Sequence, residues 1–284
     1  MEEITAYLNG RFVPYGEAKI GVEDRGYQFG DGVYEVIRVY DGKPFRMKEH
    51  LDRLVRSAGG IGLSLPDRAT LTGACMEIIR RNSLKGCSLY IQVSRGVCPR
   101  KHSIPCDIEP TVVIIGREIS GPPAEYRANG VKAITVADDR WARCYLKTTN
   151  LLPNILAKQK AERAGAYEAI FVRDGFVTEG SSTNTFIVES GVLVTPALTN
   201  YILGGVTRAA VIEAARSLGI EVKEDPIPVE RLLSADEVWA TATVAEMMPI
   251  VNINGAGVGE GKPGPMFSGV YAAYVKMYSG GQTM

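Results

Sequence analysis

The chain has 284 residues, of which 45% are hydrophobic and 23% are charged, a balance typical of a globular protein rather than a disordered one. At roughly 150 residues per domain, this length predicts two lobes. Lys and Arg together number 32, as do Asp and Glu, so the net charge is zero. The chain therefore has no overall positive charge that would attract nucleic acid or an anionic membrane.

The sequence also gives no support for metal binding, disulfide bonds or export. Two His residues cannot form a multi-histidine metal centre, and the five Cys residues include no Cys-x-x-Cys pair, which favours reduced thiols. The first residues contain no basic stretch followed by an apolar run, and no apolar run reaches the roughly 18 residues of a membrane-spanning helix. We therefore expect a cytoplasmic protein without metal, membrane or nucleic-acid partners.

The first half of the chain predicts strands that alternate with helices. Asn9-Gly10 separates two short alternating runs and favours a tight hairpin over residues 5–13. A β-branched and aromatic run predicts a strand at residues 32–40, and Asp41-Gly42 then turns the chain back toward residues 45–47. Apolar spacing and the capping residue Asp67 predict two helices, at residues 49–58 and 68–82. Two strands follow, at residues 88–94 and 111–116.

The second half continues this mixture of helices and strands. Residues 119–123 are rich in Gly and Pro and are the best candidate for a linker. Beyond it we expect three strands, at residues 131–136, 167–172 and 176–178. We also expect three helices, at residues 153–164, 207–218 and 266–277. The sequence thus predicts an α+β fold with an N-terminal α/β lobe over residues 1–118 and a C-terminal lobe over residues 124–284.

Common nucleotide-binding and hydrolase motifs are missing from the sequence. There is no GxxxxGK[ST] loop and no GxSxG turn, and the Gly-rich stretch at residues 255–259 lacks the third glycine of a dinucleotide fingerprint. Gly204-Gly205-Val206-Thr207 directly precedes a predicted helix, and the free N–H groups of a helix N-terminus bind phosphate. An ordinary loop with a Thr near the helix start would give the same pattern.

Three further sets of polar residues are candidates for chemistry. Arg100 and His102 lie between two prolines that favour extended backbone, so their side chains project to one side and suit a carboxylate. Glu179 follows a strand, where it could bind a cationic ring nitrogen or cap its own turn. Lys147 stands among apolar and hydroxyl residues, where a partly desolvated amine is a usable nucleophile; a solvent-exposed lysine at a strand end is the alternative.

A lysine, a downstream acid and a phosphate cradle are the parts that a pyridoxal-phosphate enzyme needs. Their order and local sequences resemble the fold-type IV pyridoxal-phosphate enzymes, the class IV family of branched-chain and D-amino acid aminotransferases. The resemblance runs over residues 24–250 and rests on five blocks in the same order, at residues 23–35, 49–54, 143–147, 178–182 and 205–208.

The resemblance implies a role for each matched residue. Lys147 would be the Schiff-base lysine and the proton shuttle on pyridoxal 5′-phosphate (PLP), the implied cofactor. Glu179 would be the partner of the pyridine nitrogen of PLP. The phosphate group of PLP would be held by four further residues, namely Arg53, the backbone of Val206 and Thr207, and Thr243.

Within the family, the chain most resembles the D-amino acid transaminases, because it contains Pro99-Arg100-Lys101-His102. In those enzymes the Arg and His of this stretch, with the tyrosine that matches Tyr34, trap the substrate α-carboxylate. Arg100 and His102 would come from the neighbouring subunit. The implied activity is PLP-dependent transamination between D-amino acids and 2-oxo acids, such as D-alanine and 2-oxoglutarate, in a homodimer with shared active sites.

Two departures from the family pattern leave other reactions open. Branched-chain transaminases carry Gly-Thr-Ala where this chain has Ala242-Thr243-Val244, and D-amino acid enzymes carry a Thr/Ser-rich version. Pro153 stands close to Lys147 in the sequence. Branched-chain L-transamination, (R)-amine transamination and aminodeoxychorismate lyase activity are therefore alternatives on the same scaffold. A catalytically idle binding protein would require the loss of Lys147 or Glu179, and both residues are present.

Overall fold

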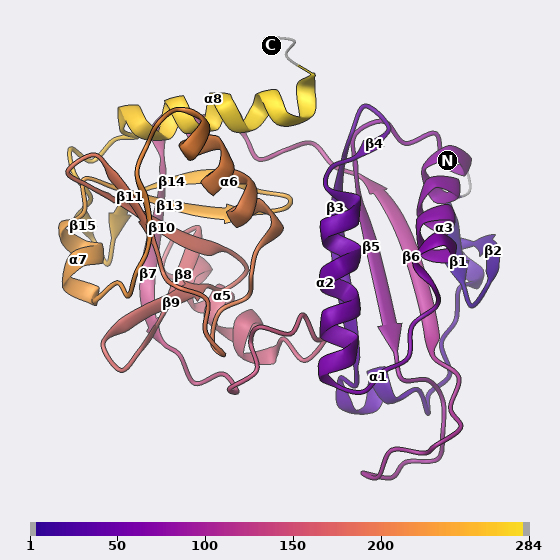
Figure 1. The fold of residues 1–284 in the computed structure, drawn as a ribbon. Helices are drawn as coiled ribbons and strands as arrows, with labels where there is room; N and C mark the ends of the chain where they lie inside the picture. Colours follow the sequence, from indigo (N-terminus) through magenta and orange to yellow (C-terminus); the bar gives the residue numbers. More distant parts are fainter. Residues whose placement is uncertain (1–3, 281–284) are drawn as a thin grey trace. The chain divides into compact units, whose positions relative to one another are not determined.

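The computed structural model describes residues 4–280 and divides the chain into two compact units (Figure 1). Unit 1 extends to Ser120 and includes the separate segment Leu146–Leu151, and unit 2 comprises Gly121–Tyr145 and the chain from Leu152 onward. The sequence placed Lys147 in the C-terminal lobe, but the structure places its segment in unit 1. The reason is that the backbone of residues 147–149 hydrogen-bonds to that of residues 32–34 in unit 1.

Unit 1 is built on a six-stranded antiparallel sheet with the strand order β2-β1-β6-β5-β3-β4. Its strands are β1 (Thr5–Leu8), β2 (Arg11–Pro14), β3 (Gly32–Tyr40), β4 (Lys43–Pro44), β5 (Cys87–Ser94) and β6 (Thr111–Glu118). Its helices are the 3-10 turn η1 (Tyr15–Glu17), α1 (Arg25–Phe29), α2 (Met47–Gly60) and α3 (Arg68–Arg81). Helix α2 packs on β3, while α3 packs on β1 and β6 (Figure 1).

The core of unit 1 follows from alternation along the strands and helical spacing along α2 and α3. Leu89 and Ile91, two residues apart on β5, are fully buried against Leu54 of α2 and Ile78 of α3. Asp67 caps α3 as predicted, because its Oδ1 accepts a hydrogen bond of 2.8 Å from the backbone N–H of Thr70.

Two turns in unit 1 show how local sequence sets the backbone. Asn9 and Gly10 have φ angles of 46° and 85°, which confirms the predicted tight hairpin between β1 and β2. The Asp41-Gly42 turn also forms and returns the chain along β3, where β4 covers Lys43–Pro44 and the N–H of Phe45 donates to the carbonyl of Arg38 at 2.8 Å. Arg46 adopts a left-handed φ of 52° and is the N-cap of α2, which ends the extended backbone there.

Unit 2 contains a mixed sheet with the order β12-β11-β10-β13-β14-β7-β8-β9, and β15 pairs with β14. Its strands are β7 (Val131–Ala137), β8 (Glu168–Arg173), β9 (Phe176–Gly180), β10 (Asn184–Glu189), β11 (Val192–Thr195), β12 (Val222–Glu224), β13 (Glu237–Ala242), β14 (Glu246–Ile253) and β15 (Ala256–Gly257). Its helices are α4 (Ala124–Asn129), α5 (Leu152–Arg163), α6 (Val206–Ser217), α7 (Val229–Ser234) and α8 (Pro265–Ser279). Helix α5 packs on β7 and β8, and α6 packs on β13 and α8. The two units together confirm the α+β fold class.

Three general features of residues 4–280 bear on function. No helix in this range is long and apolar enough to cross a membrane. The same residues contain no group of three or more His, Cys, Asp or Glu side chains that could hold a metal ion. All five cysteines are free thiols.

A buried ion pair ties α2 to β3 in unit 1. Arg53 of α2 donates from Nε and Nη2 to the two carboxylate oxygens of Glu35 on β3, at 2.7 and 2.9 Å, and His50 Nδ1 lies 2.8 Å from Glu35 Oε2. Burial alone raises the pKa of Glu35, but the charge and hydrogen bonds of Arg53 outweigh it, with help from His50, and lower the pKa to about 2. Burial also lowers the pKa of His50. An ionised carboxylate only accepts, so the Nδ1 of His50 carries the proton that it donates to Glu35.

Glu35→Gln should lower the free energy of unfolding by about 3 kcal/mol at pH 7, because it removes the negative charge that Glu35 presents to the buried Arg53. The folded-state pKa of Glu35 lies below its ordinary value of 4.5, so its stabilisation is present above pH 4.5 and is lost as the pH falls toward 2. The stability difference between the wild type and Glu35→Gln, measured by urea unfolding, should therefore shrink over this range. Glu49→Gln, on the exposed side of α2, is the control and should change stability little. A difference that stays constant with pH would contradict the assignment.

Candidate active site

Lys147 and Tyr34, two of the residues singled out from the sequence, lie together in unit 1. The backbone of Lys147 is held on two sides, because its N–H donates to Ser57 Oγ at 2.9 Å and its carbonyl accepts from the N–H of Tyr34 at 3.0 Å. Its Nζ lies 3.3 Å from Tyr34 Oη and 4.3 Å from the centre of the tyrosine ring. A half-buried amine beside a phenol hydroxyl is suited to accept and deliver a proton.

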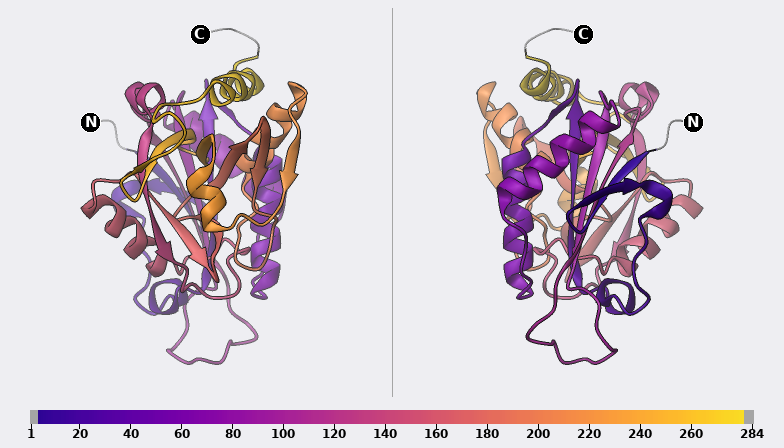
Figure 2. Two further views of the ribbon diagram at one scale, coloured as in Figure 1. Left: turned by 90° about the vertical axis from the view of Figure 1, so that its left-hand side faces the viewer. Right: turned by 90° about the vertical axis from the view of Figure 1, so that its right-hand side faces the viewer.

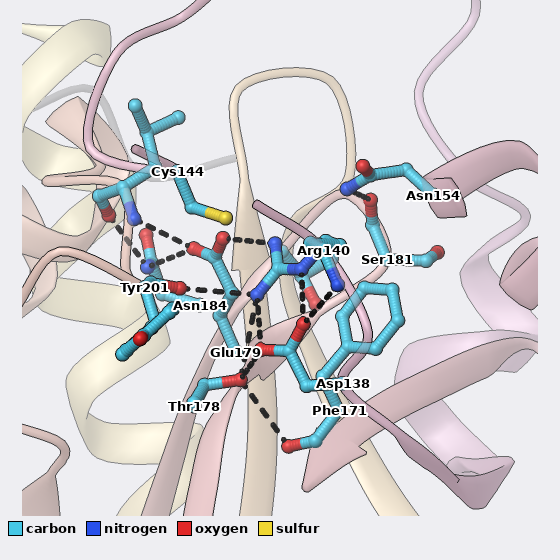
Figure 3. Close-up of polar contacts among 12 residues, drawn as sticks. Asp138, Arg140, Cys144, Asn154, Phe171, Thr178, Glu179, Ser181, Asn184 and Tyr201 are labelled. Carbon is cyan, nitrogen blue, oxygen red and sulfur yellow. Dashed lines mark hydrogen bonds and ion pairs between the residues drawn. The ribbon is translucent and has the colours of Figure 1, made fainter. Parts of the chain in front are cut away.

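Glu179 is buried at the end of β9 in unit 2, where Arg140 binds one of its two oxygens. Arg140 Nη1 donates to Glu179 Oε1 at 2.6 Å, and the same guanidinium donates to both oxygens of Asp138, each at 2.9 Å (Figure 3). Burial lowers the pKa of Arg140, but Asp138 and Glu179 outweigh this effect and raise the pKa above its ordinary value. Thr178 Oγ1 donates to Asp138 at 2.8 Å, so the acid on the far side of Arg140 is also fixed.

The second oxygen of Glu179 connects it to the chain that precedes α6. Glu179 Oε2 accepts from the backbone N–H of Leu203 at 2.9 Å and from Asn184 Nδ2 at 3.3 Å (Figure 3). Asn184 Nδ2 also donates to the carbonyl of Leu203 at 2.8 Å. The carboxylate, the amide and the loop that leads to α6 therefore form one connected group.

The N-terminus of α6 has the features of an anion site. Gly205 is its N-cap and has no side chain to accept from the first N–H groups of the helix, those of Val206 and Thr207. A Cβ on Gly205 would lie 2.0 Å from Asn184 Oδ1, so only glycine allows this close approach. The predicted cradle and Glu179 are thus both in contact with Asn184.

Thr243 lies at the same end of the unit 2 sheet. It stands in the turn between β13 and β14, two residues after Thr241, which pairs with Asn184 across the β10–β13 ladder. Its side chain is half-buried. The structure therefore groups four of the predicted cofactor-binding residues in unit 2, namely Glu179, Val206, Thr207 and Thr243.

Arg53, the remaining predicted phosphate ligand, lies in unit 1 with Lys147 and Tyr34. Its guanidinium is held by Glu35, a partner that sequence reasoning did not find. The signal for this pair was available, since Glu35 lies on a predicted strand and Arg53 and His50 lie three residues apart on one face of the next predicted helix. The contact of Arg53 with a phosphate stays a prediction.

Arg100 and His102 form a second, separate group in unit 1. Both lie on the loop of residues 95–110 that joins β5 to β6, which extends beyond the ends of these strands (Figure 2). Both side chains are exposed, and both contact the ring of Phe29 on α1. The two side chains thus meet at Phe29, but the chain bends at residues 99–100 and 102–103 rather than running extended as the sequence predicted.

Three functional residues in unit 2 were missed from the sequence: Asp138, Arg140 and Asn184. Asp138 and Arg140 directly follow a predicted strand, and an Asp-x-Arg spacing places both side chains on one side of an extended chain. That spacing was the available signal. Nothing local pointed from Arg140 to Glu179, because 39 residues separate the two.

Comparisons with known proteins agree with this arrangement. The family model of amino-transferase class IV matches residues 32–253. A D-alanine aminotransferase of Bacillus licheniformis is 44% identical over 267 residues, which cover 94% of each chain.

The solved structures that resemble this chain in backbone include branched-chain amino acid aminotransferases. That of Escherichia coli has a TM-score of 0.93 at 31% identity, covering 99% of this chain and 97% of the other. That of Thermoproteus uzoniensis, solved with norvaline, has a TM-score of 0.89 at 33% identity, covering 98% of this chain and 95% of the other. The chain belongs to the class IV aminotransferases, whose fold is fold type IV.

Proposed function

We propose that this aminotransferase moves amino groups between D-amino acids and 2-oxo acids, such as D-alanine and 2-oxoglutarate, with PLP as its cofactor. The observation that carries the proposal is the connected group in unit 2, where a buried carboxylate and a helix N-terminus capped by glycine share Asn184. The D-alanine aminotransferases that match at 42–44% identity over most of the chain support the choice of D-amino acids.

The residues of unit 2 suit the charged groups of PLP. The N–H groups at the start of α6 suit its phosphate, Thr243 can donate to the same group, and Glu179 suits its ring nitrogen. In unit 1 we assign Arg53 to the phosphate and Lys147 to the covalent link with the cofactor. When bound, PLP withdraws electrons from the amino acid Cα, which allows the Cα proton to be removed.

The chain's own groups would then move the proton and hold the charge. Lys147 Nζ would take the proton from Cα and return it, a role supported by its position beside Tyr34 Oη. Glu179 would hold a proton on the ring nitrogen, and Arg140 and Asp138 fix the carboxylate in place for this role.

We assign Arg100, His102 and Tyr34 to the substrate α-carboxylate, with Arg100 and His102 acting in the site of a second subunit of a homodimer. Exposed apolar side chains on α1 and the chain next to it support a subunit contact there. Val22 is 77% exposed, Tyr27 is 80% exposed and Ile104 is 54% exposed. Highly exposed apolar side chains of this kind are typical of an interface.

The reducing cytoplasm fits this enzyme, because all five cysteines are free thiols. The main alternative is branched-chain L-transamination on the same scaffold, which the branched-chain structures with TM-scores of 0.93 and 0.89 favour. (R)-amine transamination and aminodeoxychorismate lyase activity have no further observation in their favour. Omitting the 2-oxo acid from the assay separates the lyase, which needs no amino acceptor.

Lys147 should carry the cofactor. Borohydride should fix PLP onto the peptide that contains Lys147, because reduction makes the nitrogen–carbon link permanent, and mass spectrometry of the digest locates it. Lys147→Ala should lose this label and nearly all turnover, since both the nucleophile and the proton shuttle are gone. Lys160→Ala, on the exposed side of α5, is the control and should keep both. A label on another lysine would refute the assignment.

Glu179→Gln should lower kcat by about a hundredfold or more, because the side chain keeps its shape but loses the charge that holds the ring-nitrogen proton. The visible spectrum of the bound cofactor should change as well, which gives a readout that does not depend on turnover. Glu189→Gln is the control for the loss of a charge in the same sheet. Glu189 is the last residue of β10, and the change breaks its ion pair with Arg231. Wild-type turnover and spectrum in Glu179→Gln would remove the proposed role.

Arg100→Ala should reduce kcat/KM for D-alanine by about ten- to a hundredfold, which is the cost of one charged hydrogen bond to the substrate carboxylate. An (R)-amine without a carboxylate should be affected far less. Lys101→Ala removes the neighbouring exposed cation and should leave D-alanine kinetics close to wild type. If Arg100→Ala has no effect, or if the wild-type enzyme prefers L-leucine to D-alanine, branched-chain transamination replaces the proposal.

A further inference from the structure

Arg100 and His102 are long, exposed side chains on a loop that extends beyond its strands (Figure 2). A carboxylate clamp on such a loop would lose affinity to the entropy of ordering its side chains unless another group fixes them. We propose that Phe29 is the positioning residue of this clamp, holding Arg100 and His102 in place before substrate binds. This inference rests on the proposed function, because it assumes that the two residues bind the substrate carboxylate.

The ring of Phe29 is a common platform for the clamp. Arg100 Cζ lies 4.3 Å from the ring centre, within the range in which a guanidinium is attracted to an aromatic face. The imidazole of His102 meets the same ring edge-on, with 5.8 Å between centroids and 67° between planes. Arg25 Cζ lies 4.8 Å from the same centre. Three basic side chains thus surround one half-buried ring.

The backbone of the loop is fixed to the same short helix. Arg25 Nη1 donates to the carbonyl of Lys101 at 2.7 Å, and the backbone N–H of Arg25 donates to the carbonyl of Gly96 at 2.9 Å. Arg25 is itself held by Asp31, at 2.8 Å, and is almost fully buried. Helix α1 therefore holds the loop backbone through Arg25 and the two clamp side chains through Phe29.

The base of the loop is narrow, so these contacts act on a segment whose ends are already fixed. Gly96 has a φ of 111°, and a Cβ there would lie 1.9 Å from the carbonyl oxygen of Glu109 on the returning chain. The freedom that remains is at the tip, where Arg100 and His102 lie. Phe29 is the aromatic group that contacts both of them.

If Phe29 only fills space, its replacement should affect the KM for D-alanine differently than if its ring attracts the cations of the clamp. Phe29→Leu keeps most of the volume and removes the aromatic face, so it should raise KM for D-alanine about three- to tenfold with kcat nearly unchanged. The (R)-amine kinetics should not change. Phe29→Tyr should restore the D-alanine KM. In the Arg100→Ala background, Phe29→Leu should raise the KM for D-alanine less than it does in the wild type. The reason is that Arg100, one of the two side chains that Phe29 positions, is absent.

Two further measurements keep the test decisive. Pentafluorophenylalanine at position 29 keeps the shape of the ring but removes its negative face, and it should raise the D-alanine KM even if Phe29→Leu fails to fold. Phe12→Leu removes another ring that stacks on an arginine of unit 1, Arg81 at 4.4 Å, and should leave the D-alanine KM unchanged.

The failure of this inference differs from the failure of the proposed function. If Arg100→Ala weakens D-alanine turnover but Phe29→Leu and the fluorinated ring do not, the positioning role is overturned and the function stands. Equal losses for D-alanine and the (R)-amine in Phe29→Leu would also overturn it, since they indicate a general structural defect. If Arg100→Ala itself has no effect, the clamp and the proposed function fail together.

Discussion

Hydrogen bonds between the segment of Lys147 and the start of β3 are the constraint on which the rest of the site in unit 1 depends. The chain leaves unit 2 at Tyr145, joins unit 1 for Leu146–Leu151 and returns to unit 2 at Leu152. Both the N–H and the carbonyl of Lys147 are bonded, so only the side-chain torsions of this lysine remain free. Strand β3 also carries Tyr34, so the Lys147 amine and the Tyr34 phenol are held by the same strand. Little conformational entropy would therefore be lost in bringing these two groups together.

Close packing at the start of β3 makes this arrangement possible. A Cβ on Gly32 would lie 2.8 Å from the carbonyl oxygen of Val93 and 3.4 Å from Thr149 Oγ1. The N–H of Thr149 donates to the Gly32 carbonyl at 3.0 Å. A side chain at this position would clash with the backbone of Val93 on β5, so the start of β3, to which the lysine segment is bonded, would have to shift. The close approach of β5 at residue 32 thus helps to fix the position of the lysine segment along β3.

Buried charges in both units are balanced by neighbours that hold them in fixed orientations. Glu35 faces Arg53 in unit 1, while Arg140 stands between Asp138 and Glu179 in unit 2. An unpaired buried charge would cost several kcal/mol, so each pair is a condition for burial rather than a source of extra stability. Groups oriented in this way need no rearrangement when charge develops during the reaction.

Features set by contacts between residues close in the sequence were predicted, whereas contacts between residues far apart in the sequence were missed. Asn9-Gly10 sets its turn through its own φ angles, and Asp67 caps α3 by reaching the N–H three residues on, so both were predictable. Lys147 was singled out from the sequence, but its unit was not predicted, because its backbone partner on β3 lies more than 100 residues earlier in the chain. Arg140 was missed for the same reason, since its importance comes from its hydrogen bond to Glu179, which lies 39 residues away in the chain. Residue type and local pattern can indicate chemistry, whereas pairings across the fold need the three-dimensional arrangement.

The absence of a side chain at Gly205 makes the N-terminus of α6 and the carboxylate of Glu179 interdependent. Asn184 Oδ1 occupies the space that a Cβ on Gly205 would need, and the Nδ2 of the same amide contacts Glu179. Any residue larger than glycine must move Asn184, and that movement changes the surroundings of the carboxylate. If PLP binds as proposed, variation at the helix terminus would be limited by the acid–base role of Glu179 as well as by phosphate binding. Mutations that adapt the enzyme to a cofactor analogue with a different anionic group would have to change residues 184 and 205 together.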